Sequence, residues 1–344
     1  MVTGGSGSGK STRVQNVLYP ALLKRFGKPT EMTGEHALIE GAECIEAVVM
    51  VDQTPIGRTT RSNPASYVGA FDAVRKSFAA APMAKQRGYT LGTFSFNSGA
   101  GRCATCGGNG FEHVEMQFLS DVYLRCPDCN GRRYRDEVLE VLVQPDGKRS
   151  LNIAEVLELT VAEAIEYFAE EREVVAKLQP LAEVGLEYLK LGQPVPTLSG
   201  GEAQRLKLAG YLADAGDRLR TTGSTRSDGS SRGTLFIFDE PTTGLHFDDI
   251  EKLLRAFRRL IDAGHSLLVI EHNLDVIAAA DWIVDLGPEG GDAGGEVVCV
   301  GTPHEVMRHT TSHTGKALRE SVGGWRSAIS RNAHRLGEQT QTAH

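Results

Sequence analysis

The sequence predicts an α/β fold built around a nucleotide-binding loop. Residues 4–11, GGSGSGKS, match the phosphate-binding pattern Gly-x-x-x-x-Gly-Lys-Ser and follow a short strand-like stretch at residues 1–3. Helical periodicity comes next, because four apolar side chains share one face: Val14, Val17, Leu18 and Leu22. Far downstream, apolar runs at 235–238 and 266–270 each lead into a carboxylate, as expected of buried strands whose ends meet along one crevice.

Composition indicates an ordinary globular protein. The chain has 344 residues, enough for two domains, of which 40% are apolar and 24% charged. We expect it in the cytoplasm, because it shows no membrane span, no secretion signal and too few cysteines for a disulfide scaffold. The net charge is −7, yet residues 54–102 hold seven basic side chains against Asp72 alone. This excess indicates either a polyanion-binding surface or a solvated face.

The loop at residues 4–12 has the chemistry to bind nucleotide phosphates. Its glycines allow backbone N–H groups to surround phosphate oxygens, and the helix that follows adds positive potential. Lys10 is expected to reach the β- and γ-phosphates, and the Ser11 hydroxyl to bind Mg²⁺. The predicted nucleotide-binding residues of the loop are Gly4, Gly7, Gly9, Lys10, Ser11 and Thr12.

Each of the two downstream runs delivers polar side chains at its end. Asp239 and Glu240 follow the first run, and we predict that Asp239 organises the metal while Glu240 activates the attacking water. The alternative is a strand that merely ends in an acidic turn. His272 follows the second run and is either a structural hydrogen-bonding residue or a contact to the γ-phosphate.

The segment LSGGEAQR predicts a second anion site at a helix N-terminus. Ser199 and Glu202 have capping-box spacing, and Gly200 and Gly201 leave backbone N–H groups uncovered at the positive end of the helix. A well-capped helix is the simpler alternative. Because the loop around Lys10 already serves one nucleotide, the second site is expected to bind the phosphate of a nucleotide held by another ATP-binding half.

Four cysteines predict a structural zinc site. They form two Cys-x-x-Cys pairs, separated by nineteen residues, and glycines follow each pair: Cys103, Cys106, Cys126 and Cys129. Four thiolates leave no open position for water, which is typical of structural rather than catalytic zinc.

These motifs resemble those of ABC-type ATPases, with residues 4–12 as Walker A, FIFDEP as Walker B and LSGGEAQR as the signature. The cysteine insert, together with DQTPIGRTTRSNPASY, VEMQFLSDVYLRC and ADWIVDLGPEGGDAGGEV, resembles the C-terminal half of the UvrA family, which recognises DNA damage in bacterial nucleotide excision repair. The resemblance covers residues 1 to about 320 and implies an ABC-type ATPase core, an inserted helical signature domain and a small zinc module.

The resemblance also implies site roles and partners. Gln53 corresponds to the Q-loop glutamine and His272 to the switch histidine, both sensing the γ-phosphate of ATP, and two ABC halves would enclose two ATP molecules head to tail. Damaged double-stranded DNA is the implied partner, with UvrB implied by the family alone. Candidate DNA contacts, chosen by charge and by position near the zinc module, are Lys85, Arg87, Arg102, Arg132 and Arg133.

The expected domains are an ATP-binding core of residues 1–53 and 206–344 and a signature domain of residues 54–205, with the zinc module at about 88–140. We expect a disordered loop at 214–233, a flexible tail at 321–344 and the absence of the family's preceding strands, as in a fragment or split gene product. Two other functions stay open: a UvrA-like drug-resistance protein, or a zinc- and DNA-binding fragment that does not hydrolyse ATP.

Overall fold

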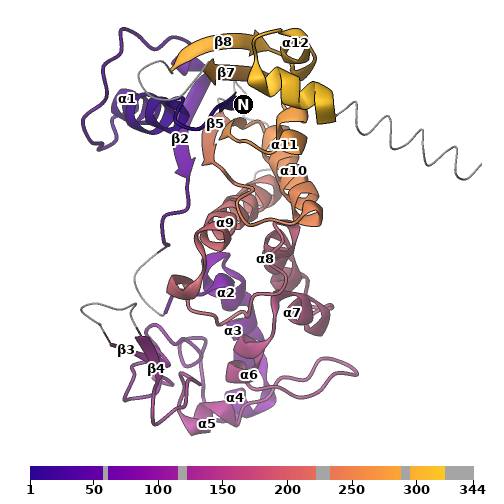
Figure 1. Cartoon of the computed structure of the whole chain (residues 1–344). Coiled ribbons are helices and arrows are strands. Elements are labelled where there is room, and N and C mark those ends of the chain that lie inside the picture. The colour runs from indigo at the N-terminus through magenta and orange to yellow at the C-terminus, as the bar shows by residue number, and fades with distance from the viewer. Residues whose placement is uncertain (57–60, 115–121, 222–232, 288–294, 322–344) are drawn as a thin grey trace, which may run out of the picture. The chain divides into compact units, whose positions relative to one another are not determined.

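The computed structural model describes residues 1–56, 61–114, 122–221, 233–287 and 295–321. The chain divides into two compact units, one formed by residues 1–52 and the chain from 226 onward, the other by residues 53–225 (Figure 1). None of the described helices is long and apolar enough to cross a membrane.

The first unit is built on a six-stranded sheet in the order β2-β5-β6-β1-β7-β8. The first five strands in this order run parallel, and β8 is antiparallel to β7. The short β1 therefore lies inside the sheet, between two longer strands, and its C-terminal end opens into the phosphate-binding loop. The strands are β1 (Val2–Gly4), β2 (Ile45–Val51), β5 (Gly233–Asp239), β6 (Ser266–Ile270), β7 (Ile283–Gly287) and β8 (Glu296–Gly301).

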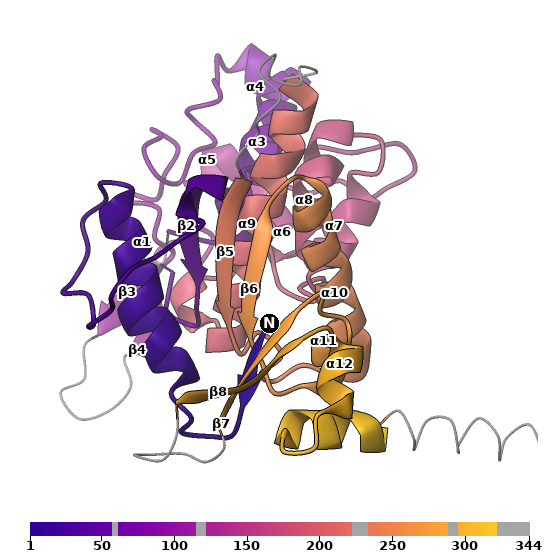
Figure 2. The same ribbon diagram turned by 90° about the horizontal axis from the view of Figure 1, so that it is seen from above.

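Helices cover both faces of this sheet (Figure 2). Successive strand residues point to opposite faces, so Ile237 packs in a buried cluster with Val14 and Leu22, whereas the ring of Phe238 lies 4.7 Å from that of Phe257 on α10. The predicted helix after the loop is present, as a π-helical turn that continues into α1. The helical segments of this unit are Thr12–Leu18, α1 (Tyr19–Arg25), Ala42–Cys44, α10 (Phe247–Asp262), α11 (Leu274–Ala278) and α12 (Pro303–Arg308).

A buried carboxylate anchors the strand that leads into the loop. Asp285 on β7 accepts hydrogen bonds from the hydroxyls of Thr3 at 2.8 Å and of Ser312 and Thr314 at 2.7 Å. Thr3 lies on β1, whereas Ser312 and Thr314 lie in the segment after α12, and together they satisfy the charge although only 2% of Asp285 is exposed. This network holds the start of β1 in place.

The second unit is helical, with a small two-stranded module. Its long helix α9 packs on α8, and α8 in turn packs on α3 and α7. The cysteines lie around the antiparallel pair formed by β3 (Phe111–Val114) and β4 (Val122–Arg125). The helical segments are α2 (Pro64–Tyr67), α3 (Ala70–Ala80), α4 (Pro82–Gln86), α5 (Asp136–Leu139), α6 (Ile153–Glu158), α7 (Val161–Tyr167), α8 (Arg172–Glu183), Val195–Thr197 and α9 (Gly200–Thr221).

Helix α9 departs from the sequence-based expectations. Residues 206–221 were expected in the ATP-binding core, but they continue the signature helix and belong to the second unit, where Leu206, Leu208 and Leu212 are all buried. The prediction of a disordered loop is wrong for residues 214–221, which are helical: the Ala- and Arg-containing stretch is compatible with a helix despite its neighbouring Gly/Ser-rich segment. Residues 222–232 and 322–344 lie outside the described residues.

Candidate nucleotide site and cysteine centre

The loop at residues 4–11 has the backbone conformation that its glycines permit. Gly4, Gly7 and Gly9 have φ values of 133°, 77° and 80°. The Nζ of Lys10 donates hydrogen bonds to the carbonyl oxygens of Gly4 at 3.0 Å and Gly5 at 2.8 Å. Burial lowers the pKa of Lys10, while the nearby carboxylates Glu240, Asp239 and Asp285 act in the opposite direction. The ammonium group is thus fixed over the loop that it is predicted to serve.

The structure brings Asp239 to this loop. The Ser11 hydroxyl lies 3.5 Å from Oδ1 of Asp239, and the side-chain amide of Gln15 donates a hydrogen bond to Oδ2 of the same carboxylate. Ser11 and Gln15 are four residues apart, so they lie on the same side of the helical segment. Burial and the neighbouring Glu240 raise the pKa of Asp239, whereas the hydrogen bonds from Ser11 and Gln15 lower it. Gln15 was not among the predicted site residues.

Glu240 and His272 also meet at this edge of the sheet. Nε2 of His272 lies 3.5 Å from Oε1 of Glu240. Glu240 has a left-handed backbone, with φ at 45°, and its amide donates a hydrogen bond to the carbonyl of Ile270 at 2.9 Å. A strained backbone at a polar residue is often found at functional sites.

Glu271 follows β6 directly, and its side chain anchors the backbone after both β5 and β6. Its carboxylate accepts backbone N–H bonds from Thr242 at 2.8 Å, His272 at 2.7 Å and Asn273 at 3.0 Å, and only 2% of the residue is exposed. The same side chain therefore fixes the turn after Glu240 and the backbone of His272. Asn273 caps helix α11, since its side chain accepts hydrogen bonds from the backbone N–H groups of Asp275 and Val276.

The signature segment forms the capping box that its spacing predicts. Ser199 N donates to Glu202 Oε2 at 2.7 Å, the Ser199 hydroxyl donates to the same oxygen at 2.8 Å, and Glu202 N donates back to Ser199 at 3.3 Å. Tyr188 donates to the other carboxylate oxygen at 2.7 Å. Although burial opposes ionisation, the hydrogen bonds from Tyr188 and Ser199 outweigh it and lower the pKa of Glu202. Gly200 and Gly201 begin the helix, where backbone N–H groups have no intrahelical acceptor.

Gln53 belongs to the second unit and lies beside this helix start. A Cβ placed on Gly200 would be 3.1 Å from both Cβ and Oε1 of Gln53. Glycine at position 200 therefore allows the two segments to approach closely. The expected contact between Gln53 and a γ-phosphate stays a prediction.

The four predicted cysteines form a compact buried cluster. Their sulfur atoms all lie within 4.8 Å of one another, with Cys103 and Cys126 separated by 4.0 Å and Cys106 and Cys129 by 3.6 Å. A tetrahedral Zn²⁺ with Zn–S bonds of about 2.3 Å would place its ligands about 3.8 Å apart. Gly110 N also donates to Cys106 Sγ at 3.2 Å, as in the outer shell of a metal site. The donor set and its spacing fit zinc.

Three thiols of this cluster differ in acidity. Burial raises the pKa of Cys106, and it raises that of Cys129 to about 12. For Cys103 burial is outweighed by hydrogen bonds from the backbone of Cys106 and Thr105, which lower its pKa. Because zinc binds thiolates, metal binding must displace protons here.

The predicted DNA-contacting residues differ in availability. The prediction that Arg133 contacts DNA at the surface is wrong, because the residue is only 3% exposed. Its Nη2 donates a hydrogen bond to the carbonyl of Gly192 at 3.0 Å, and its guanidinium group lies over the ring of Phe96. Arg102 donates to three carbonyls of its own module, Asn97, Gly99 and Gly107. Lys85 is exposed, while Arg87 and Arg132 are ion-paired with Glu140 and Asp136.

Comparison with known proteins finds relatives that match nearly the whole chain. No protein-family model matches it. The UvrABC system protein A of Methanothermobacter thermautotrophicus is 55% identical over 326 residues, which are 95% of this chain and 32% of that protein. The protein of the same name from Listeria monocytogenes is 49% identical over 343 residues, or 99% of this chain and 33% of the relative.

A solved structure agrees with these relatives. The crystal structure of UvrA2 from Deinococcus radiodurans matches with a TM-score of 0.77 and 48% identity, covering 93% of this chain and 36% of that one. The predicted α/β core, helical signature domain and cysteine module are confirmed. The chain spans about a third of the length of the curated relatives that it matches.

Proposed function

Because this chain belongs to the UvrA family, we propose that it is an ABC ATPase half that acts in ATP-dependent recognition of DNA damage during nucleotide excision repair. The observation that carries the proposal is the convergence of Lys10, Ser11, Asp239, Glu240 and His272 at one edge of the parallel sheet. Ligands of open α/β sheets bind at this edge, outside the carboxyl ends of the strands.

Each residue at this edge has a role suited to its chemistry. Lys10 and the N–H groups of the loop bind the β- and γ-phosphates of ATP. Ser11 and Asp239 would hold Mg²⁺, which would neutralise phosphate charge. Glu240 accepts a proton from the attacking water, and its 3.5 Å contact with His272 orients its carboxylate while leaving the histidine near the γ-phosphate.

The second anion site completes the arrangement. The start of α9, at Gly200 and Gly201, offers uncovered N–H groups and a helix dipole, and the Ser199–Glu202 capping box holds them in position. We assign this site to the phosphates of an ATP molecule bound by a second ABC half, with Gln53 as a further sensor. We propose that the second half is either another copy of this chain or the N-terminal ABC half of the family, whereas an interaction with UvrB rests on the family resemblance alone.

The cysteine module is assigned to zinc and to the DNA-binding part of the function. Cys103, Cys106, Cys126 and Cys129 would hold one structural ion that fixes the surrounding turns. Contacts to DNA phosphates position a duplex without reading its sequence, which suits the recognition of many lesions through the deformability of DNA.

Binding of duplexes with and without a single lesion tests the proposal. We expect the zinc-loaded chain to bind the damaged duplex more tightly, and ATP to change the ratio of the two affinities. Fluorescence anisotropy with labelled duplexes measures both, and Lys10→Ala serves as the control that should lose the effect of ATP. Equal affinities for the two duplexes, with and without ATP, would contradict damage recognition by this chain.

A further inference from the structure

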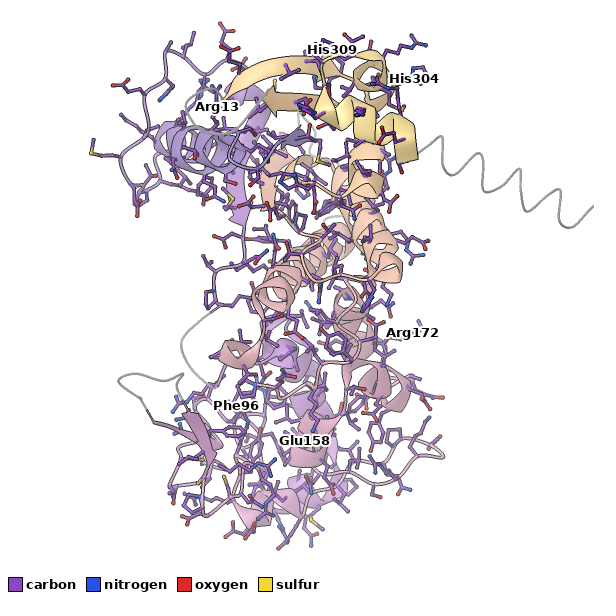
Figure 3. The ribbon with its side chains drawn as sticks, viewed as in Figure 1. Arg13, Phe96, Glu158, Arg172, His304 and His309 are labelled. Carbon is purple, nitrogen blue, oxygen red and sulfur yellow. The ribbon has the colours of Figure 1, made fainter. Side chains whose placement is uncertain are left out.

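A cavity of about 580 Å³ lies inside the second unit, where the cysteine module meets the helices. Its lining comes from β3 and β4, the turn after Cys129, helix α6 and the segment 190–197 that leads into the signature. We call it the junction groove. Glu158 on α6 is one of its lining residues (Figure 3). Arg133 lines it as well and lies over the ring of Phe96. The volume is in the range of ligand-binding clefts.

Four cationic side chains line the junction groove, and they are not equivalent. Arg133 is buried and fixed to Gly192, so it belongs to the framework. Arg132 pairs with Asp136 at 3.1 Å and donates to the carbonyl of Cys129. Arg125 is exposed, its stem passes over Gly131, and among the described residues it has no ion-pair partner.

Two carboxylates share the lining and are already engaged. Glu155 accepts the backbone N–H of Asn152 at 2.8 Å in the capping box of α6. Glu158 pairs with Nζ of Lys190 at 2.8 Å, and both side chains are more than half exposed. An exposed pair of this kind is worth little, so a stronger anion can displace the carboxylate from Lys190. Arg125 is therefore available to an anion directly, whereas Lys190 becomes available when the anion displaces Glu158.

We propose that the junction groove binds the phosphodiester backbone of DNA through Arg125 and Lys190. The inference rests on the proposed function and moves the DNA contact from the predicted Arg102 and Arg133, whose guanidinium groups hold the module together, to two cations that face a cavity. Arginine offers paired donors to phosphate oxygens, and lysine adds a point charge. The groove also touches the segment that leads into Ser199, so DNA and signature would share one element.

Salt-dependent binding of a labelled duplex to the zinc-loaded full chain tests this site. The variants are Arg125→Gln, Lys190→Gln and Glu158→Gln. The matched controls are Lys76→Gln and Glu173→Gln, because this ion pair has similar side-chain exposure, 56% and 59% against 55% and 71%, and lies outside the groove. Zinc content and thermal unfolding are measured for each variant to verify the fold.

A plot of the log of the DNA association constant against log salt concentration has a negative slope. Loss of one phosphate contact should make this slope shallower by about 0.9, which corresponds to about eight-fold weaker binding at about 0.1 M salt. Arg125→Gln and Lys190→Gln should each show this loss. Glu158→Gln should instead strengthen binding, because it removes a competing negative charge and frees Lys190. The controls should stay within about two-fold of the unsubstituted chain.

The outcomes separate this inference from the function on which it rests. If the unsubstituted chain binds the duplex while the groove variants behave like Lys76→Gln, the groove is not the DNA site and DNA binding stands. If the unsubstituted chain binds no duplex, both fail. A gain of affinity in Glu158→Gln cannot come from unfolding, so its absence in a folded variant counts against the groove even where the other two variants lose zinc.

Discussion

Replacing Gly4 by alanine should be among the most damaging single-methyl changes in the chain. A Cβ at position 4 would lie 2.0 Å from the carbonyl oxygen of Leu286 and 2.9 Å from its carbonyl carbon. Carbon–oxygen contacts between strands are normally no shorter than about 3.3 Å, so the overlap is about 1.3 Å. The atom in the way is backbone of the neighbouring strand β7, and it cannot move unless β1 and β7 separate.

The conformation of Gly4 adds to this cost. Its φ of 133° lies where residues with a side chain are strained by about 1–3 kcal/mol. Opening the β1–β7 ladder would weaken further hydrogen bonds, each contributing about 1 kcal/mol. We therefore expect Gly4→Ala to lower the free energy of unfolding by at least about 3 kcal/mol, which is large for a single substitution.

Gly5 supplies the matched control. A Cβ there would meet no atom within 4 Å, and Gly5 is not among the residues with positive φ. We expect Gly5→Ala to change the free energy of unfolding by less than about 0.5 kcal/mol. Urea unfolding followed by circular dichroism compares the two variants. Equal stabilities, or a loss below about 1 kcal/mol in Gly4→Ala, would refute the steric argument.

Three further substitutions test the site. Gln15→Leu removes one hydrogen bond from Asp239, and we expect about ten-fold more Mg²⁺ to be needed for half-maximal ATP binding, with binding in EDTA unchanged. Asp239→Asn should abolish the effect of Mg²⁺ on nucleotide binding and raise the melting temperature at neutral pH. The second effect is expected because the pKa of Asp239 is raised in the folded state. Such a carboxyl group stabilises the fold when protonated, and that stability is lost as pH rises through the raised pKa. Zinc affinity should increase from about pH 6 to about pH 8, because buried Cys129, with a pKa of about 12, must lose its proton, and Cys129→Ser should abolish stoichiometric zinc.

Each of these has a clear contrary result. Unchanged Mg²⁺ dependence in Gln15→Leu would mean that the amide does not orient the carboxylate. A lower melting temperature in Asp239→Asn would mean that hydrogen bonding outweighs burial and repulsion in the free protein. Zinc affinity that is independent of pH, measured by competition with a chromogenic chelator, would contradict the release of thiol protons.

Most of the nucleotide site could be predicted from the sequence, because strand ends are easy to locate. The apolar runs before Asp239 and before His272 predict buried parallel strands, and parallel strands bring their ends to one edge. Gln15 could not be found this way. Its spacing of four residues from Ser11 is visible in the sequence. The spacing lets both side chains contact Asp239 only because the fold places Asp239 beside the helix.

The second unit shows why charge alone misleads. Arg133 follows Arg132 in sequence and both were expected on the surface, yet Arg133 has a positive φ of 70°, is buried and donates a hydrogen bond to the carbonyl of Gly192. Arg125 was overlooked, although it precedes Cys126 directly and its exposure follows from its place on a two-stranded module. Burial of a cation depends on contacts with Phe96 and Gly192, which are distant in sequence and invisible in composition.

The proposed function requires that Lys10 of one ABC half and Ser199 of another complete one ATP site. It is tested most directly by the ATPase rate of the zinc-loaded chain at increasing protein concentration, with Glu240→Gln as the blank. We predict that activity rises more steeply than linearly with concentration and vanishes in the blank, because two copies must associate head to tail. Activity above the blank that rises only in proportion to protein concentration, in protein shown to be folded and zinc-loaded, would contradict it.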